Sequence, residues 1–326
     1  MVFGFFESHW TAAQIPDLTG KVAMVTGGNT GIGYVTCLEL ARAGAKVYMA
    51  SRTVQRATEA IARIKAELPA GDVRFLQFDL TQLASATRTA ESFMNEEQRL
   101  DILVNNAGIA MAPYELGPDG IEVQACNGTG HFALTTKLLP ILRKTAGLEG
   151  SDVRVVTVSS DAHKFTWAPD FSSLEGLNKP CANSAVRYGN SKLSNMVFTQ
   201  ELQSRVDDCG ILCLSVHPGA VSTEISRSGL KSFPYLAPFM FIQDYVMMSP
   251  QDGAITQLYA ATCPEVKEKQ LKGAYLVPFG KLGKKSTLGE DKEGKLGREF
   301  WSLCENLVAV AEAASADPFR PGGPTA

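Results

Sequence analysis

The chain has 326 residues, of which 45% are hydrophobic and 20% are charged, with a formal net charge of -3. This composition is typical of a folded globular protein, and it excludes a largely disordered chain and a polycationic surface for nucleic acid. Seven scattered cysteines show no metal-ligand spacing, so we expect reduced thiols in an intracellular, cytoplasmic protein and no metal site.

The first segment, residues 1–21, precedes the first predicted strand. Acidic residues interrupt it, and it lacks the basic stretch and long apolar core of a secretory signal. No run of about 20 apolar residues is present, so we expect no membrane-spanning helix. The nearest approach is the aromatic stretch 233–248, for which peripheral contact with a membrane surface stays open.

From residue 21 onward, short apolar runs alternate with longer amphipathic stretches. Strands are expected at 21–26, 46–51, 73–78, 101–105, 153–159, 211–217 and 274–277. Helices are expected at 31–44, 53–68, 83–95, 120–146, 184–206, 252–262 and 298–313. Apolar strands that alternate with helices form a parallel sheet covered on both faces. The predicted fold class is therefore α/β, a doubly wound Rossmann sheet of about seven strands in one domain, 1–316, with a disordered tail at 317–326.

A glycine-rich turn, Thr26-Gly27-Gly28-Asn29-Thr30-Gly31-Ile32-Gly33, joins the first strand to the first helix. Such a turn lets the backbone approach a pyrophosphate, whose charge then meets the N–H groups of the helix N-terminus, although a tight turn without a ligand also fits. The spacing Gly-x-x-x-Gly-x-Gly resembles the single-domain branch of the short-chain dehydrogenase/reductase family. The resemblance implies a cofactor held by Gly27, Asn29, Thr30, Gly31, Ile32 and Gly33.

The second strand ends at Ser51-Arg52, where an NAD-selective site would place an acidic residue. The Arg52 guanidinium can pair with the 2′-phosphate of NADP(H), although a solvated surface arginine also fits this position. NADP(H) is therefore the expected cofactor. After the third strand, Asp79 and Leu80 match the family position that contacts the adenine ring.

The fourth strand ends in Asn105-Asn106-Ala107-Gly108, which matches a motif of the family. The resemblance places Asn106, Ala107 and Gly108 beside the cofactor ribose, whereas Asn105 fits a purely structural role equally well. On the next predicted helix, Asn127 matches the family's fourth catalytic residue. In the family this residue holds a water in a proton relay that reaches the catalytic lysine.

Tyr188 and Lys192 lie four residues apart on a predicted helix, so their side chains share one face. An ammonium near a phenol is expected to lower the pKa of the phenol from about 10, which suits a general acid/base. Upstream, the fifth strand ends at Ser160, which by similarity to the family bonds the substrate carbonyl. The family role of Lys192, beside Tyr188, includes holding the nicotinamide ribose. A catalytic role for His163 is disfavoured.

The sixth strand leads into His217-Pro218-Gly219-Ala220-Val221-Ser222-Thr223, which matches the family's Pro-Gly motif. The resemblance implies that the nicotinamide carboxamide is anchored by Pro218, Gly219, Val221 and Thr223. A substrate lid is expected near 225–250, because the chain that follows this motif is rich in aromatic and methionine side chains. It could cover the substrate, the protein body, a second subunit of a homodimer, or a membrane surface.

The gap between Ser160 and Tyr188 adds Phe165, Trp167 and Phe171 to this expected apolar pocket, although ordinary core packing fits each of them as well. The long gap, the Ala-Ser-Arg-Thr strand end and the sequence Gly273-Ala274-Tyr275-Leu276-Val277-Pro278 resemble the retinol-dehydrogenase-like group. The chain departs from membrane-bound members of that group, because it shows no N-terminal spanning helix.

The expected function is an NADPH-dependent carbonyl reductase or alcohol dehydrogenase that acts on an apolar aldehyde or ketone. Tyr188 donates the proton to the substrate oxygen, which Ser160 orients. Two other classes stay open. One is a nonenzymatic NADP(H) sensor, which commonly loses the tyrosine or lysine, and the other is a related enzyme acting on carbon–carbon double bonds or sugar nucleotides.

Overall fold

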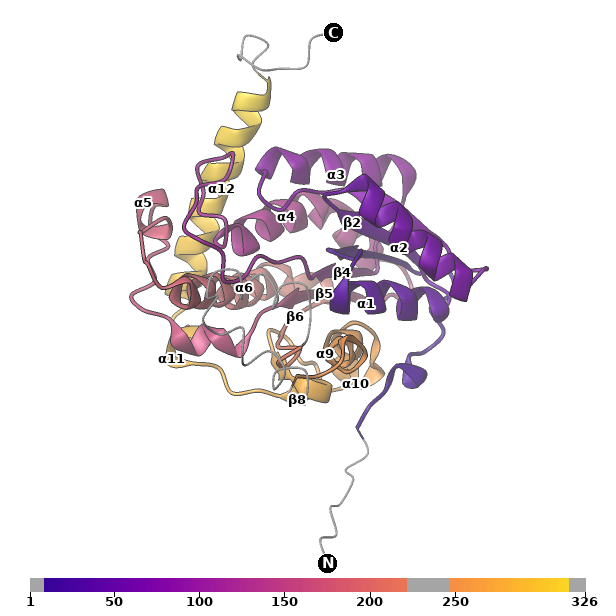
Figure 1. Ribbon diagram of the computed structural model, residues 1–326. Helices are drawn as coiled ribbons and strands as arrows, with labels where there is room; N and C mark the ends of the chain where they lie inside the picture. The colour runs from indigo at the N-terminus through magenta and orange to yellow at the C-terminus, as the bar shows by residue number, and fades with distance from the viewer. Residues whose placement is uncertain (1–8, 222–246, 317–326) are drawn as a thin grey trace, which may run out of the picture.

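The computed structural model describes residues 9–221 and 247–316, and Figure 1 shows how the chain runs through them. The strands are β1 (Val22–Thr26), β2 (Lys46–Ser51), β3 (Val73–Gln77), β4 (Ile102–Asn105), β5 (Val153–Val158), β6 (Ile211–Val216), β7 (Tyr275–Val277) and β8 (Lys281–Leu282). The long helices are α1 (Gly31–Arg42), α2 (Val54–Glu67), α3 (Leu83–Glu96), α4 (Cys126–Ala146), α6 (Ser184–Val206), α9 (Pro250–Thr262) and α12 (Lys295–Ala316). Short helices are η1 (Ala12–Gln14), η2 (Asp161–Phe165), α5 (Leu174–Leu177), η3 (Asp207–Cys209), α10 (Pro264–Glu268), η5 (Pro278–Gly280) and α11 (Thr287–Glu290).

The strands form one sheet in the order β3-β2-β1-β4-β5-β6-β7-β8. Each neighbouring pair from β3 to β7 is parallel, and only β8 runs antiparallel, against β7. This topology confirms the predicted α/β class with a doubly wound sheet. The eighth strand was not predicted, because two residues that follow a turn carry too short an apolar pattern to be distinguished from loop.

Two hydrophobic cores lie on opposite faces of the sheet. Helices α3, α4, α6 and α12 cover one face, and α1, α2 and α9 cover the other (Figure 1). Every residue of the central strands β1, β4, β5 and β6 is buried, whereas the edge strand β3 is buried only at Val73 and Leu76. Continuous apolar sequences are therefore found in the strands that helices cover on both sides.

Helix α4 begins at Cys126 rather than at residue 120 as the sequence predicted. The preceding residues form a loop in which Leu116 bridges to Glu122. The Glu122 carboxylate accepts hydrogen bonds from the backbone N–H groups of Gln124 and Ala125, each at 3.0 Å. This buried carboxylate fixes the turn that precedes the helix, and a periodicity argument cannot detect it.

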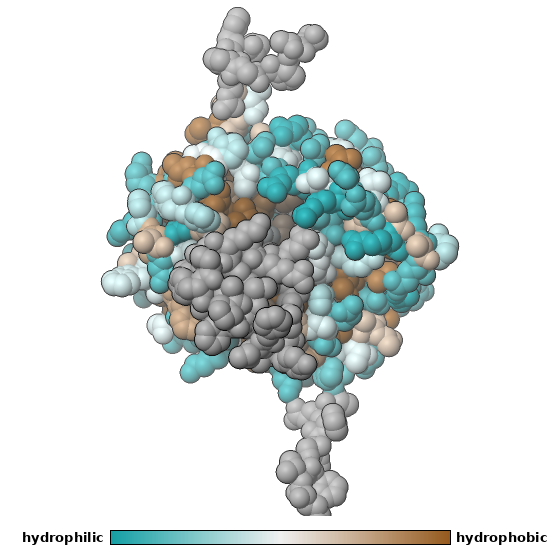
Figure 2. All heavy atoms as spheres, viewed as in Figure 1, coloured by the Kyte–Doolittle hydropathy of each residue, from teal (hydrophilic) through white to brown (hydrophobic). Residues whose placement is uncertain are grey.

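The C-terminal helix α12 packs across α3, α4 and α6. Its first turns are anchored by the buried side chains of Phe300, Trp301 and Cys304, and the Arg205 guanidinium lies 4.1 Å from the centre of the Trp301 ring. The other end of the helix projects beyond the body of the protein (Figure 1). In Figure 2, hydrophilic residues predominate on the described part of the visible face, with hydrophobic residues scattered between them.

Among residues 9–221 and 247–316, no helix is long and apolar enough to cross a membrane, and no group of histidine, cysteine or acidic side chains could hold a metal ion. Most of the predicted substrate lid and the predicted tail, 317–326, lie outside the described residues.

Candidate active site

The glycine-rich turn lies at the carboxyl end of the parallel strands. Gly27 has a φ of 66°, and its N–H donates to the carbonyl of Ala50 on β2 at 2.7 Å. A Cβ atom at Gly33 would collide with the Gly27 carbonyl oxygen and the Asn106 side-chain amide. Thr30, the N-cap of α1, makes no capping hydrogen bond through its side chain. The turn therefore leaves backbone N–H groups at the start of α1 for an anion.

The turn after β4 is joined to this glycine turn through Thr26. The Thr26 hydroxyl oxygen accepts hydrogen bonds from the backbone N–H groups of Asn106, at 2.8 Å, and Ala107, at 2.9 Å. The Asn106 side chain donates to the Thr26 carbonyl at 2.7 Å. Asn105 is fully buried instead, and its amide donates to Thr135 of α4 at 2.9 Å. Asn105 therefore has a structural position between sheet and helix.

Arg52 follows β2 with an exposed side chain, and it makes no hydrogen bond or ion pair with any residue that the structure describes. The neighbouring Ser51 hydroxyl is buried and also has no partner among those residues. After β3, the Asp79 carboxylate accepts from the backbone and hydroxyl of Thr81, at 3.0 and 2.8 Å, and Leu80 is buried. The carboxylate of Asp79 thus stabilises its own turn.

Helix α6 carries Tyr188 and Lys192 on the face that meets the end of β5. The buried Lys192 ammonium donates to the carbonyl of Val158 at 2.8 Å and lies 5.6 Å from the centre of the Tyr188 ring. The Ser159 hydroxyl donates to the Lys192 carbonyl at 2.7 Å. These contacts fix the end of β5 against the helix, and so they bring the partly buried Ser160 to Tyr188.

Burial raises the pKa of Tyr188 to about 12, and a hydrogen bond with the side chain of Ser160 acts in the opposite direction. Burial lowers the pKa of Lys192 to about 8. The expectation that Lys192 lowers the pKa of Tyr188 is therefore wrong for this structure. The physical reason is that desolvation disfavours the phenolate, while the ammonium lies over the ring and is bonded to Val158.

Asn127 is fully buried at the start of α4, and both polar atoms of its side-chain amide are hydrogen-bonded to protein groups. Its Oδ1 accepts from the Ile109 N–H at 2.8 Å, and its Nδ2 donates to the Ile109 carbonyl at 2.8 Å and to the Ser191 hydroxyl at 3.0 Å. The Ser191 hydroxyl in turn donates to the Tyr188 carbonyl at 2.8 Å. The side chain thus joins the loop after β4 to α6, and the water relay that the resemblance implies for Asn127 stays a prediction.

The Pro-Gly motif lies at the same edge of the sheet, after β6. Gly219 has a φ of 94°, and the Ala220 carbonyl accepts from the Met248 N–H at 2.8 Å. Val221 and Ile32 of the glycine turn both lie against Gly253 of α9, where a Cβ atom would collide with the Val221 side chain. The motif and the glycine turn are therefore adjacent. Pro218 precedes this bend, and Thr223 lies outside the described residues.

His163 supports the backbone beside Ser160. Its Nδ1 lies 2.7 Å from the Ser160 carbonyl, and its Nε2 accepts from the Ser286 N–H at 3.0 Å. Since a carbonyl can only accept, Nδ1 carries the proton and both ring nitrogens are occupied. The imidazole therefore joins the segment before α11 to the end of β5.

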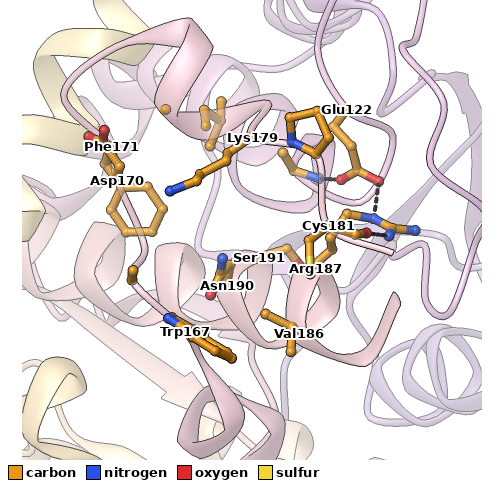
Figure 3. A pocket seen from close by; sticks show the side chains of 15 residues that line it. Glu122, Trp167, Asp170, Phe171, Lys179, Cys181, Val186, Arg187, Asn190 and Ser191 are labelled. Carbon is orange, nitrogen blue, oxygen red and sulfur yellow. Dashed lines mark hydrogen bonds and ion pairs between the residues drawn. The ribbon is translucent and has the colours of Figure 1, made fainter. Parts of the chain in front are cut away.

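The aromatic residues of the Ser160–Tyr188 gap differ in burial. Phe171 is buried, 5.4 Å from Phe300 between ring centres, whereas Phe165 and Trp167 are 71% and 79% exposed. Trp167 and Phe171 border a cavity of about 300 Å³, which also includes Asn190 on α6 (Figure 3). Asn190 is two residues from Tyr188, so it projects from a different side of the helix. The expected apolar pocket also involves the stretch 233–248, most of which lies outside the described residues, so it stays a prediction.

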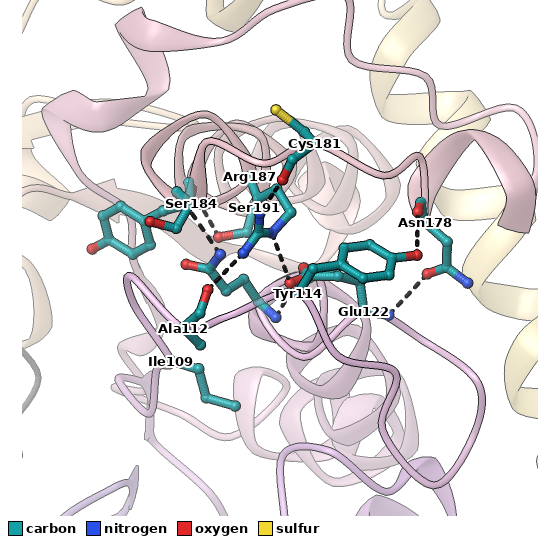
Figure 4. Close-up of polar contacts among 12 residues, drawn as sticks. Ile109, Ala112, Tyr114, Glu122, Asn178, Cys181, Ser184, Arg187 and Ser191 are labelled. Carbon is teal, nitrogen blue, oxygen red and sulfur yellow. Dashed lines mark hydrogen bonds and ion pairs between the residues drawn. The ribbon is translucent and has the colours of Figure 1, made fainter. Parts of the chain in front are cut away.

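Sequence reasoning also missed a buried ion pair next to Tyr188. The Arg187 guanidinium donates to Glu122 at 3.1 Å, to the Ala112 carbonyl at 2.6 Å and to the Cys181 carbonyl, and the two charged side chains are 6% and 4% exposed (Figure 4). Arg187 therefore joins the first turn of α6 to the turn that precedes α4. No sequence spacing connects residues 65 positions apart, so only the tertiary structure reveals this pair.

Comparisons with known proteins agree with this architecture. Residues 21–231 match the family model described as short chain dehydrogenase. The chain is 41% identical to the short chain dehydrogenase/reductase dpchH of Colletotrichum higginsianum, over 94% of this chain and 79% of that protein. It is 37% identical to retinol dehydrogenase 12 of Mus musculus, over 92% of this chain and 89% of that protein.

A solved structure, the Pseudomonas aeruginosa RhlG/NADP active-site complex, superposes with a TM-score of 0.63 at 26% identity, covering 81% of this chain and 96% of that one. The family binds a nicotinamide cofactor and consists of oxidoreductases, and the fold, the glycine turn and the matched segment all agree with it. The chain therefore belongs to the short-chain dehydrogenase/reductase family, in its retinol-dehydrogenase-like group.

Proposed function

We propose that the protein is an NADP(H)-dependent carbonyl reductase or alcohol dehydrogenase, with Tyr188 as its general acid/base. The observation that carries this proposal is the meeting of Tyr188, Lys192 and Ser160 at the edge of the sheet that also holds the glycine turn. Ligands of doubly wound folds bind at this carboxyl edge of the strands. Catalysis of hydride transfer there requires a proton donor beside the cofactor site.

The residues present fit a dinucleotide. Gly27 and Gly33 keep side chains away from the turn, and the first N–H groups of α1 can meet a pyrophosphate. Arg52 is exposed at the end of β2 with no carboxylate beside it, which supports a 2′-phosphate and hence NADP(H). We assign the other cofactor contacts to Asn29, Thr30, Leu80 and Asn106 to Gly108, and to the Pro-Gly motif through Thr223.

In reduction, the reduced nicotinamide supplies the hydride when it is bound. Tyr188 donates the phenolic proton to the substrate oxygen, and its pKa of about 12 keeps this proton in place at neutral pH. The Ser160 hydroxyl orients the carbonyl oxygen and stabilises the developing negative charge. The Lys192 ammonium, which is bonded to the Val158 carbonyl, would hold the nicotinamide ribose when the cofactor is bound. Asn127 acts indirectly, because its side chain bonds the Ser191 hydroxyl, which in turn bonds the carbonyl of Tyr188.

The proposed substrates are apolar aldehydes and ketones. We propose that a lid near 225–250 covers them, and that the lid belongs to the same single domain as the cofactor site. One relative is named retinol dehydrogenase 12, which supports an apolar alcohol or aldehyde for this chain. If the lid buried about 100 Å² of apolar substrate surface, that burial would contribute roughly 2.5 kcal/mol to the free energy of substrate binding.

A substrate panel tests this proposal directly. Purified protein is mixed with NADPH or NADH and with pairs of carbonyls that differ only in chain length or an added ring, and loss of the reduced coenzyme is followed. We expect turnover with NADPH and a lower KM for the longer or aromatic member of each pair. Equal rates with short polar and long apolar carbonyls would overturn the substrate class, and no turnover in either direction would overturn the function.

A further inference from the structure

Helix α4 buries a polar stripe against the sheet, at Asn127, His131 and Thr135. These residues are spaced by four, so they lie on one face of the helix. A helix face that packs on a central sheet is normally apolar, and each buried polar group on it needs a partner. Hydrophobic packing of the helix on the sheet therefore does not explain these three polar side chains.

His131 occupies the middle of the stripe and is fully buried. Its Nδ1 lies 2.8 Å from the main-chain carbonyl oxygen of Asn127, and its Nε2 lies 2.9 Å from the Thr26 hydroxyl. The carbonyl can only accept, so Nδ1 carries the hydrogen and Nε2 accepts the hydroxyl hydrogen of Thr26. Burial lowers the pKa of His131 to about 3, and Lys192 acts in the same direction, so the ring is neutral as these two bonds require.

The two partners of His131 belong to the two halves of the active site. Thr26 holds the N–H groups of Asn106 and Ala107, in the turn beside the proposed cofactor ribose. The Asn127 side chain is hydrogen-bonded to the Ile109 backbone and to the Ser191 hydroxyl, and this hydroxyl donates to the Tyr188 carbonyl. The imidazole thus connects Thr26, on the cofactor side, to the main chain of Asn127, whose side chain is bonded to the acid/base side.

We propose that His131 is a positioning residue, which sets the placement of the cofactor turn relative to Tyr188 through its bonds to Thr26 and Asn127. This inference rests on the proposed function. His131 touches neither the proposed substrate position nor the phenol, so its effect passes through Asn127 and Ser191. A misplacement of about 1 Å between reacting groups costs on the order of 100-fold in rate.

The test compares His131→Phe, which keeps a ring but loses both hydrogen bonds, with His131→Gln, whose amide offers a donor and an acceptor at similar reach. The matched control is Thr145→Val at the far end of α4, where a fully buried hydroxyl accepts from the Leu100 N–H at 2.9 Å. All three lose or alter a buried side-chain hydrogen bond of the same helix. The kcat, KM and NADPH dissociation constant are measured on folded protein.

We expect His131→Phe to lower kcat about 10- to 100-fold, with KM and the NADPH dissociation constant changed less than about threefold, and we expect His131→Gln to recover most of the loss. Thr145→Val should keep the wild-type kcat. Equal kcat values for His131→Phe and Thr145→Val would overturn the proposal. If His131→Phe does not fold, His131→Asn replaces it, since the shorter amide cannot span both partners, and the same loss is expected.

Hydrogen exchange provides a readout that does not depend on turnover. His131→Phe should lose protection at the amides of Asn106, Ala107 and Ile109, whereas Thr145→Val should not. Unchanged protection at these three amides would overturn the positioning role even in an active enzyme. If the wild-type protein turned over no carbonyl or alcohol, the proposed function would fail, and the exchange result would still decide whether His131 couples the two loops.

Discussion

Replacing Arg187 with methionine should destabilise the protein strongly, because it leaves Glu122 as an uncompensated buried charge. Both side chains are at least 94% buried, and the guanidinium donates to the carboxylate at 3.1 Å. Removal of one partner of such a pair costs about 3–5 kcal/mol, whereas an exposed pair contributes about 0–1 kcal/mol. Methionine fills a similar volume, so the loss of the charge partner dominates over the cavity.

The double variant Glu122→Gln/Arg187→Met separates charge from packing. Glutamine keeps an oxygen that can accept from the N–H groups of Gln124 and Ala125, but it carries no charge. The double variant should therefore recover most of the stability that the single variant loses. The control is Arg74→Met, where a 45% exposed guanidinium pairs with Asp72 on the surface.

Urea unfolding followed by circular dichroism measures the free energy of unfolding of all four proteins. We expect a large loss for Arg187→Met, a small loss for Arg74→Met and an intermediate value for the double variant. The reasoning is refuted if Arg187→Met loses no more stability than Arg74→Met, or if the double variant is no more stable than Arg187→Met alone.

Three further predictions concern the cofactor and the proton. The wild type should prefer NADPH over NADH about 10- to 100-fold, since a hydrogen bond to a charged group contributes about 1.5–3 kcal/mol, and Arg52→Ala should remove this preference. Equal kcat/KM for both coenzymes in the wild type would contradict the assignment of Arg52 to the 2′-phosphate. Gly33→Ala should weaken coenzyme binding, measured by fluorescence titration, because its Cβ would collide with the Gly27 carbonyl and the Asn106 amide; unchanged affinity would show that the turn does not hold the coenzyme. The kcat for reduction should be level below about pH 8 and fall above it. Lys192, with a pKa of about 8, loses there the positive charge that would hold the nicotinamide ribose, while Tyr188 keeps its proton. A level profile to about pH 10 would contradict this role of the ammonium.

Local patterns predicted the elements and their order, because alternation of apolar strands with amphipathic helices is a short-range signal. The helix that carries Tyr188 was expected at 184–206, and α6 spans Ser184–Val206. The start of α4 was misplaced by six residues, because Glu122 holds Gln124 and Ala125 in a turn before that helix. Its carboxylate is also paired with Arg187, which lies 65 positions away, so only the tertiary structure defines this end.

Motifs located the residue types of the site but not their electrostatics. The spacing of Tyr188 and Lys192 predicted a shared face, and the structure places the ammonium 5.6 Å from the ring centre. It did not predict that burial would outweigh the charge and raise the pKa of the phenol. His131 was missed because an isolated histidine on a helix carries no signal until its partners, Thr26 and the Asn127 carbonyl, are brought to it by the fold.

The central claim is that Tyr188 supplies the proton in carbonyl reduction, and the most direct test is kcat for NADPH-dependent reduction by Tyr188→Phe. The matched control is Tyr114→Phe, which removes a phenol hydroxyl that donates to the Asn178 carbonyl before α6 but keeps the ring that faces the Arg187 guanidinium. We expect Tyr188→Phe to lose about 10²- to 10⁴-fold in kcat while its NADPH dissociation constant stays within a few-fold of wild type, and Tyr114→Phe to keep its activity. A Tyr188→Phe variant that kept more than about one tenth of the wild-type kcat would contradict the assignment of the proton donor.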